Sequence, residues 1–144
     1  MPVSEPVEMV ERAMVLLRRR MTRRSLAGEA QVNDATFGVL DAVEAAERAG
    51  TPIGVSEVAA ALSVDQPRAS KLVAAAVEAG LIRREADQAD GRRTLLVRTE
   101  AGRDLSERVH DHRRAKFAAA MADWSPADRA DFARLLTRFI DAFG

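Results

Sequence analysis

Four side chains that can read DNA lie close together near the middle of the chain: Gln66, Arg68, Ser70 and Lys71. Glutamine can pair with the edge of adenine, whereas arginine and lysine can pair with guanine or with phosphate. Apolar residues recur between them at helical spacing, which leaves the four polar side chains on the other face of a helix. The pattern favours contact with nucleic acid, and its alternative is an exposed helix face without a ligand.

A second polar cluster follows at Asp90-Gly91-Arg92-Arg93. An Asp-Gly pair is typical of a tight turn between two strands, so both arginines are expected at the charged tip of a hairpin. Taken alone, such a tip is more simply solvated. With a DNA-reading helix directly upstream, contact between this tip and DNA becomes the favoured interpretation.

The segments that carry these clusters are predicted to be a helix and a hairpin. Asp65 can cap a helix over Gln66–Ala79, and Gly80 is typical of the residue at which such a helix ends. Two short strands are predicted at 81–84 and 94–98, on either side of a polar loop over 87–93.

Five further helices are predicted from apolar periodicity and capping residues. They begin after Pro6, at the cap Asn33, near Ser56, after Thr99 and at Ser125. The first has the spacing of a helix that packs against another helix, through Val7, Val10, Met14, Leu17 and Met21. Trp124 is expected to bury its ring where the last two helices meet. A helix, a short helix, a tight turn, a helix and a hairpin, in this order, predict a winged helix-turn-helix.

The formal net charge of the 144 residues is zero, but charge is sorted along the chain. Residues 66–98 hold seven basic and four acidic side chains, and Arg12–Arg24 holds six arginines and no acid. The block Arg18–Arg24 is expected to be a solvated helix face, with phosphate contact as its alternative. There are no cysteines, which excludes disulfides and thiol chemistry, and no apolar run has the ~20 residues of a membrane span. A cytoplasmic protein without membrane contact is expected.

Several motifs point to one family. They are the run 58–64, Pro67, Ser70-Lys71-Leu72-Val73, the run 80–84, and Asp90-Gly91-Arg92 followed by Leu96, Thr99 and Gly102. Together they resemble the helix-turn-helix and wing of the MarR (multiple antibiotic resistance regulator) family, and the similarity extends over nearly the whole chain. The chain departs from the family pattern at Arg98, where leucine is usual, and at Ala76 and Val77, where a Leu-Glu pair is more typical.

The resemblance implies a mainly α fold in three parts. A winged helix-turn-helix over 33–99, with one short β-hairpin as its wing, would lie between flanking helices at 1–32 and 100–144 that form a dimerisation bundle. At the wing tip Arg92 would enter the minor groove, where a narrow stretch concentrates negative potential. Arg93 is a second candidate for phosphate or groove contact. Asp90 would orient the arginine or brace the turn, and Arg84 is expected to pair with Asp90.

The implied function is sequence-specific binding of double-stranded DNA by a transcription regulator, expected to act as a repressor. A homodimer would place two recognition helices ~34–36 Å apart on a pseudo-palindromic operator. By the habit of the family, a small anionic or phenolic effector would release the DNA. No cofactor is expected.

Other classes of function fit the residues less well. A winged helix can instead dock protein partners, and the zero net charge leaves this alternative open. An enzyme is not expected, because the chain lacks a phosphate loop and a nucleophile paired with a base. His110 and His112, two residues apart, point to different sides of a helix. Glu107, His110 and Asp111 share a face, so a weak metal site between subunits is a minor alternative to solvated or ion-paired side chains.

Overall fold

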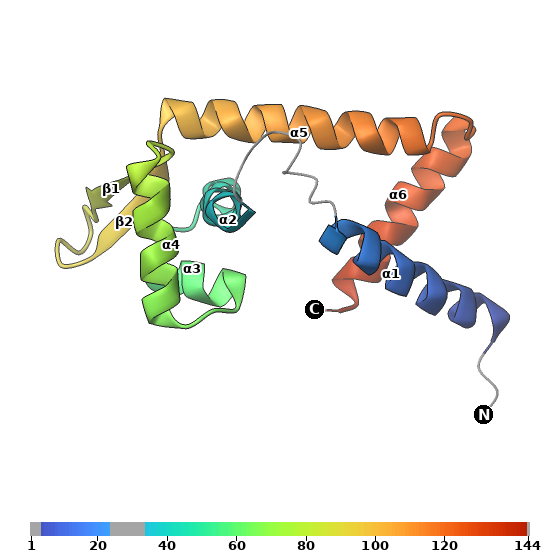
Figure 1. Cartoon of the computed structure of the whole chain (residues 1–144), viewed down its shortest axis with the longest axis horizontal. Coiled ribbons are helices and arrows are strands. Elements are labelled where there is room, and N and C mark those ends of the chain that lie inside the picture. Colours follow the sequence, from blue (N-terminus) through green and yellow to red (C-terminus); the bar gives the residue numbers. More distant parts are fainter. Residues whose placement is uncertain (1–3, 24–33, 144) are drawn as a thin grey trace. The chain divides into compact units, whose positions relative to one another are not determined.

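The computed structural model describes residues 4–23 and 34–143, and it contains two compact units, residues 1–110 and 111–144. Its elements are α1 (Glu5–Arg23), α2 (Asp34–Ala49), α3 (Val55–Leu62), α4 (Gln66–Glu78), β1 (Ile82–Ala86), β2 (Thr94–Arg98), α5 (Glu100–Ala120) and α6 (Pro126–Asp141). The fold is mainly helical with one antiparallel two-stranded hairpin, as predicted (Figure 1). The expected cap Asn33 and the end of the arginine block at Arg24 lie outside the described residues.

An apolar core joins α2, α3, α4, the hairpin and the first turns of α5. It consists of Phe37, Val39, Leu40, Val43, Ile53, Val58, Ala59, Ala69, Val73, Ala76, Ile82, Leu96, Leu105 and Val109. The residues of α3 and α4 predicted to face inward are buried or partly buried in this core. Burial of these stripes fixes which face of each helix remains for a ligand.

Local signals set the helix-turn-helix between α3 and α4. Ser63 ends α3 in the left-handed conformation, with φ of 54°. Asp65 then accepts a hydrogen bond from the Arg68 N–H at 2.8 Å, which is the predicted N-cap of α4. Gly80 has φ of 78°, a conformation that glycine adopts without strain, and the chain turns there into the hairpin.

The hairpin is anchored to the core through both of its strands. The pairing runs from Ile82 opposite Arg98 to Ala86 opposite Thr94. Strand β1 therefore extends two residues beyond the predicted end at 84, because pairing with β2 continues to the loop. Ile82 and Leu96 are buried, and the Leu96 N–H donates to the Ile53 carbonyl at 2.9 Å.

The junction between the hairpin and α5 explains two residues of the wing signature. The Thr99 hydroxyl donates to the Gly80 carbonyl at 2.6 Å and accepts from the Gly102 N–H at 3.0 Å. A Cβ on residue 102 would lie 2.2 Å from the Leu81 carbonyl oxygen, so this close approach requires glycine.

Large apolar side chains remain exposed on α1 and α6. The predicted seam of α1 forms on a helix, but Val7, Val10, Leu17 and Met21 are 42–55% exposed. On α6, which Ser125 caps as predicted, Phe132, Leu135 and Ile140 are exposed. The predicted burial of Trp124 is wrong for the single chain: the residue is 37% exposed, and its ring packs edge-to-face on Phe132. One aromatic neighbour is too little to cover so large a ring.

Candidate nucleic-acid interface

The face of α4 opposite the core carries the four residues predicted to contact DNA. Gln66, Arg68, Ser70 and Lys71 are all exposed. The opposite face buries Ala69, Val73 and Ala76, so the orientation of α4 is fixed by its core contacts. Neither Arg68 nor Lys71 forms an ion pair with any residue that the structure describes. Both charges are therefore available to an anionic ligand.

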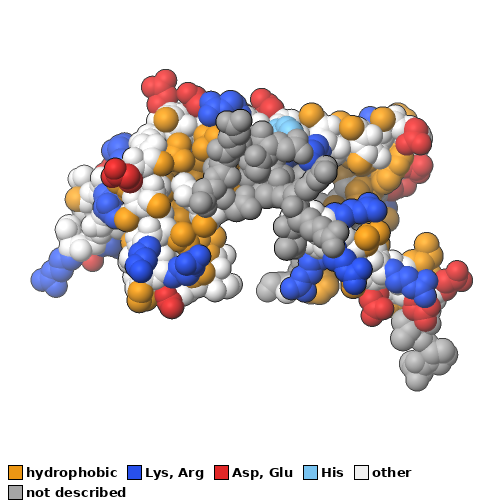
Figure 2. Space-filling model, viewed as in Figure 1, with side chains coloured by type: hydrophobic (Ala, Val, Ile, Leu, Met, Phe, Trp, Pro, Cys, Tyr) orange, Lys and Arg blue, Asp and Glu red, His pale blue; other side chains and the backbone are white. Residues whose placement is uncertain are grey.

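The wing tip is organised around Asp90. The Asp90 carboxylate accepts a hydrogen bond from the Arg92 N–H at 3.1 Å, and the Asp90 carbonyl accepts from the Arg93 N–H at 3.0 Å. This is a tight turn with Gly91 and Arg92 at its centre. The Arg92 side chain is exposed and makes no ion pair within the described ranges. Figure 2 shows Lys and Arg side chains at the hairpin end and near the start of α4.

The ion pair predicted between Arg84 and Asp90 does not form. Asp90 instead turns its carboxylate onto the backbone of its own loop, at Arg92. Arg84 is exposed and lies opposite Leu96 in the hairpin, two pairs away from the loop. Local hydrogen bonding within the turn satisfies the aspartate without the strand arginine.

Arg93 differs from Arg92 in having a partner. Its guanidinium forms an ion pair with Glu57, in the first turn of α3. Both side chains are partly exposed, at 37% and 40%. The structure thus places the Arg93 side chain at the loop end of β2, against α3, while Arg92 lies exposed in the turn.

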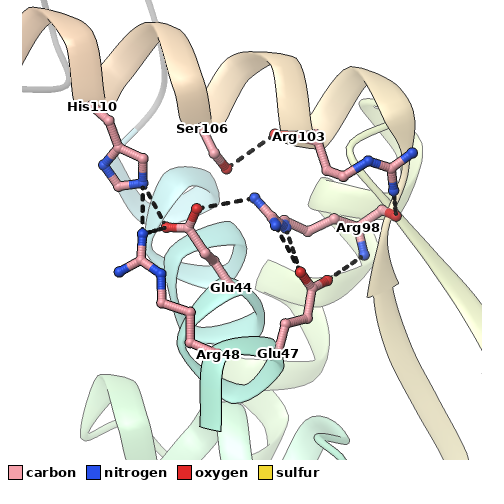
Figure 3. A network of polar contacts seen from close by, with 8 residues as sticks. Glu44, Glu47, Arg48, Arg98, Arg103, Ser106 and His110 are labelled. Carbon is pink, nitrogen blue, oxygen red and sulfur yellow. Dashed lines mark hydrogen bonds and ion pairs between the residues drawn. The ribbon is translucent and has the colours of Figure 1, made fainter. Parts of the chain in front are cut away.

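The sequence did not predict a polar network at the junction of α2, β2 and α5. We call Glu44, Glu47, Arg48, Arg98 and His110 the α2–α5 network, because it joins α2, the end of β2 and α5 (Figure 3). The Glu44 carboxylate is buried, with one oxygen 3.1 Å from Arg98 Nη1 and the other 2.7 Å from His110 Nε2. Since a carboxylate only accepts, the proton of this short contact is on Nε2.

Arg98 is the cation at the centre of the α2–α5 network. Its Nε and Nη2 donate to Glu47 Oε2 at 3.0 and 2.7 Å. Burial disfavours its charge, but the hydrogen bond and charge of Glu47, with the charges of Glu44 and Glu107, outweigh that effect and raise the pKa of Arg98. The signal for this network was the departure at Arg98, where the family pattern has leucine.

The described residues, 4–23 and 34–143, bear on metal binding and membrane insertion as well. In these ranges no three His, Cys, Asp or Glu side chains are grouped so that they could hold a metal ion. His110 is instead hydrogen-bonded to Glu44. No helix described in these ranges is long and apolar enough to cross a membrane.

Comparison with known proteins finds a similarity to one family over part of the chain. Residues 30–93 match the profile of the MarR family. The uncharacterized HTH-type transcriptional regulator YxaD of Bacillus subtilis (strain 168) is 30% identical over 92 residues, which are 64% of this chain and 64% of YxaD. The crystal structure of RV1404 from Mycobacterium tuberculosis is 27% identical with a TM-score of 0.76, covering 100% of this chain and 99% of that one. Over residues 30–93 the chain is thus similar to the MarR family.

Both similarities point to transcription regulators: the matched profile is that of the MarR family, and YxaD is an HTH-type transcriptional regulator. The same fold occurs in a mutant of MepR from S. aureus that was solved bound to an oligodeoxyribonucleotide. That structure is 18% identical with a TM-score of 0.63, and the match covers 95% of this chain and 98% of MepR. In the MarR fold, the predicted residues 66–71 and 90–93 lie on the second helix of the helix-turn-helix and on the wing.

Proposed function

We propose that this protein regulates transcription by binding a specific double-stranded DNA site through α4 and the wing. The recognition surface consists of Gln66, Arg68, Ser70, Lys71 and Arg92. One observation carries the proposal: the cations of this surface are exposed and unpaired among the described residues, on a helix whose other face is fixed by the core. A major groove admits one such helix, and the DNA-bound MepR mutant of the same fold supports this role.

The contributions of the two elements differ. Gln66 and Ser70 can hydrogen-bond to base edges, whereas Arg68 and Lys71 can bind guanine or phosphate. Arg92, at the tip of the hairpin, is placed to enter a minor groove, where its charge is favoured by a narrow A·T-rich stretch. Phosphate contacts would supply affinity and strong salt dependence, and α4 would supply sequence preference.

We also propose that the protein acts as a homodimer. The apolar side chains exposed on α1 and α6 would lie against water in a single chain, and a second copy would cover them. Two copies related by a two-fold axis read a pseudo-palindromic operator whose half-sites are ~34–36 Å apart. Light scattering coupled to size-exclusion chromatography should give twice the chain mass, and a stable monomer would contradict this part.

The regulatory outcome follows the family. We propose repression in the cytoplasm, with release of the operator by a small anionic or phenolic effector. A reporter gene behind the operator should be silenced when the protein is present. Addition of salicylate, as a probe that is both anionic and phenolic, should restore expression. A reporter that rises with the protein present would instead assign activation.

The test of DNA binding is selection of genomic fragments by the full-length protein, followed by sequencing. The proposal predicts enrichment of one pseudo-palindromic motif, including DNA upstream of the protein's own gene. Fragments enriched without a shared motif, with weak and salt-insensitive binding, would favour the alternative of a winged helix that docks protein partners.

A further inference from the structure

An ion pair joins the loop end of β2 to α3, the first helix of the helix-turn-helix. Arg93, directly before β2, contributes Nη2, and Glu57, in the first turn of α3, contributes Oε1. The other oxygen of Glu57 accepts a hydrogen bond from the Gly54 N–H at 3.3 Å. One carboxylate therefore holds both the start of α3 and the wing arginine.

The backbone on both sides of this ion pair is packed closely. The Ile53 carbonyl accepts the Leu96 N–H, so the segment before α3 lies along β2. A Cβ on Gly54 would lie 3.1 Å from the Thr94 carbonyl oxygen, which leaves little space for a side chain. The seam between α3 and the wing thus consists of close backbone contacts and the ion pair, next to one another.

The seam leads to the recognition helix. Val58 and Ala59 of α3 share the buried core with Ala69 and Val73 of α4, and the capped turn at Asp65 fixes the link between these helices. A wing held against α3 is therefore also held at a defined distance from α4. Arg92 is the residue next to Arg93 in the sequence, yet it has no acidic partner among the described residues.

We infer that Arg93 is a positioning residue: through Glu57 it fixes the wing so that Arg92 and α4 engage the same duplex. This inference rests on the proposed function. It assigns different roles to two adjacent arginines, because the charge of Arg93 is balanced by Glu57 while that of Arg92 is not. A positioning role and a direct DNA contact of Arg93 predict opposite effects of the loss of Glu57 on DNA affinity.

The experiment is a double-mutant cycle in the full-length protein with a selected operator duplex. Glu57→Gln keeps an acceptor for the Gly54 N–H but removes the charge that pairs with Arg93. Glu57→Gln, Arg93→Gln and the double variant should each bind about 5-fold more weakly than the wild type, with no additional loss in the double variant. Arg93→Gln should leave the slope of log affinity against log salt unchanged. Arg92→Gln should instead reduce the magnitude of this slope by about 1, the change expected for the loss of one phosphate contact.

Several results would overturn the inference. If Arg93 touches phosphate directly, Glu57→Gln frees it and binding stays equal or tightens, while Arg93→Gln weakens binding and lowers the salt slope. Additive losses, or no loss in either single variant, would also contradict a positioning role. Circular dichroism of each variant reports whether the fold is retained. Failure of the wild type to bind any selected duplex would overturn the proposed function itself.

Discussion

The α2–α5 network and the recognition surface both contain arginines, but the two regions differ in how these arginines are buried and paired. In the network, Arg98 is 13% exposed and lies between the carboxylates of Glu44 and Glu47. On the recognition surface, Arg68 and Arg92 are exposed and have no acidic partner within the described ranges. The role of an arginine in this protein is therefore set by its pairing and burial, not by its residue type.

The physical reason for the difference is solvation. A buried charge without a partner loses several kcal/mol of hydration, on the order of the whole stability of a domain, so Arg98 requires its carboxylates. An exposed guanidinium keeps its water at little cost and can exchange that water for phosphate. Arg93, half exposed and paired with Glu57, lies between these two extremes.

The largest expected effect is on the network. Arg98→Met should lower the free energy of unfolding by about 2–4 kcal/mol, because it leaves the buried Glu44 carboxylate with fewer cations. Urea denaturation followed by circular dichroism measures this. Arg83→Gln is the matched control, since the exposed Arg83–Glu85 pair should contribute at most about 1 kcal/mol. If both variants lose the same free energy of unfolding, the proposed difference between buried and exposed arginines is wrong.

The next effect is on the wing tip. Arg92→Ala should weaken operator binding about 10-fold, because it removes the unpaired groove cation. The free energy of unfolding should change by less than about 0.5 kcal/mol, as for other exposed positions. Anisotropy titrations and urea denaturation of the same preparation separate the two quantities. Unchanged operator affinity would exclude the minor-groove role of Arg92.

A smaller effect is expected on α4. Lys71→Gln should weaken binding about 3-fold on operator and scrambled duplexes alike, and reduce the salt slope by about 1, if Lys71 binds phosphate. Titrations at several salt concentrations give the slope. A loss confined to the operator would instead assign Lys71 to a base edge.

The smallest effect is on the turn at the wing tip. Asp90→Ala should weaken operator binding about 2-fold, because the Arg92 N–H loses its acceptor and the tip becomes less ordered. Asp90→Asn is the matched control, since its amide oxygen can still accept this hydrogen bond. If Asp90→Asn weakens binding as much as Asp90→Ala, the charge of Asp90 matters more than its hydrogen bond.

The parts of the fold that follow from local chemistry could be predicted from the sequence. The predicted bounds of α4 agree with the structure to one residue, because Asp65 caps the helix and Gly80 ends it. The inward faces of α3 and α4 also follow from apolar periodicity. The four polar residues of α4 emerge on the exposed face for the same reason.

Pairing between distant side chains could not be predicted in this way. Glu44 and Arg98 are separated by 54 positions, and helical periodicity does not say which acid meets which base. The predicted partner of Asp90 was the strand residue Arg84, but the turn backbone at Arg92 is closer at hand. The unusual arginine at position 98 was the one sequence feature that indicated a charged pair next to the core.

The most direct test of the recognition surface is fluorescence anisotropy of the full-length protein with a duplex from upstream of its own gene and a scrambled duplex of equal composition. The proposed recognition surface predicts tight binding to the upstream duplex only, with affinity falling by about 10³-fold or more between 50 and 200 mM salt. Equal, weak and salt-insensitive binding to both duplexes, and to the fragments chosen by genomic selection, would contradict it.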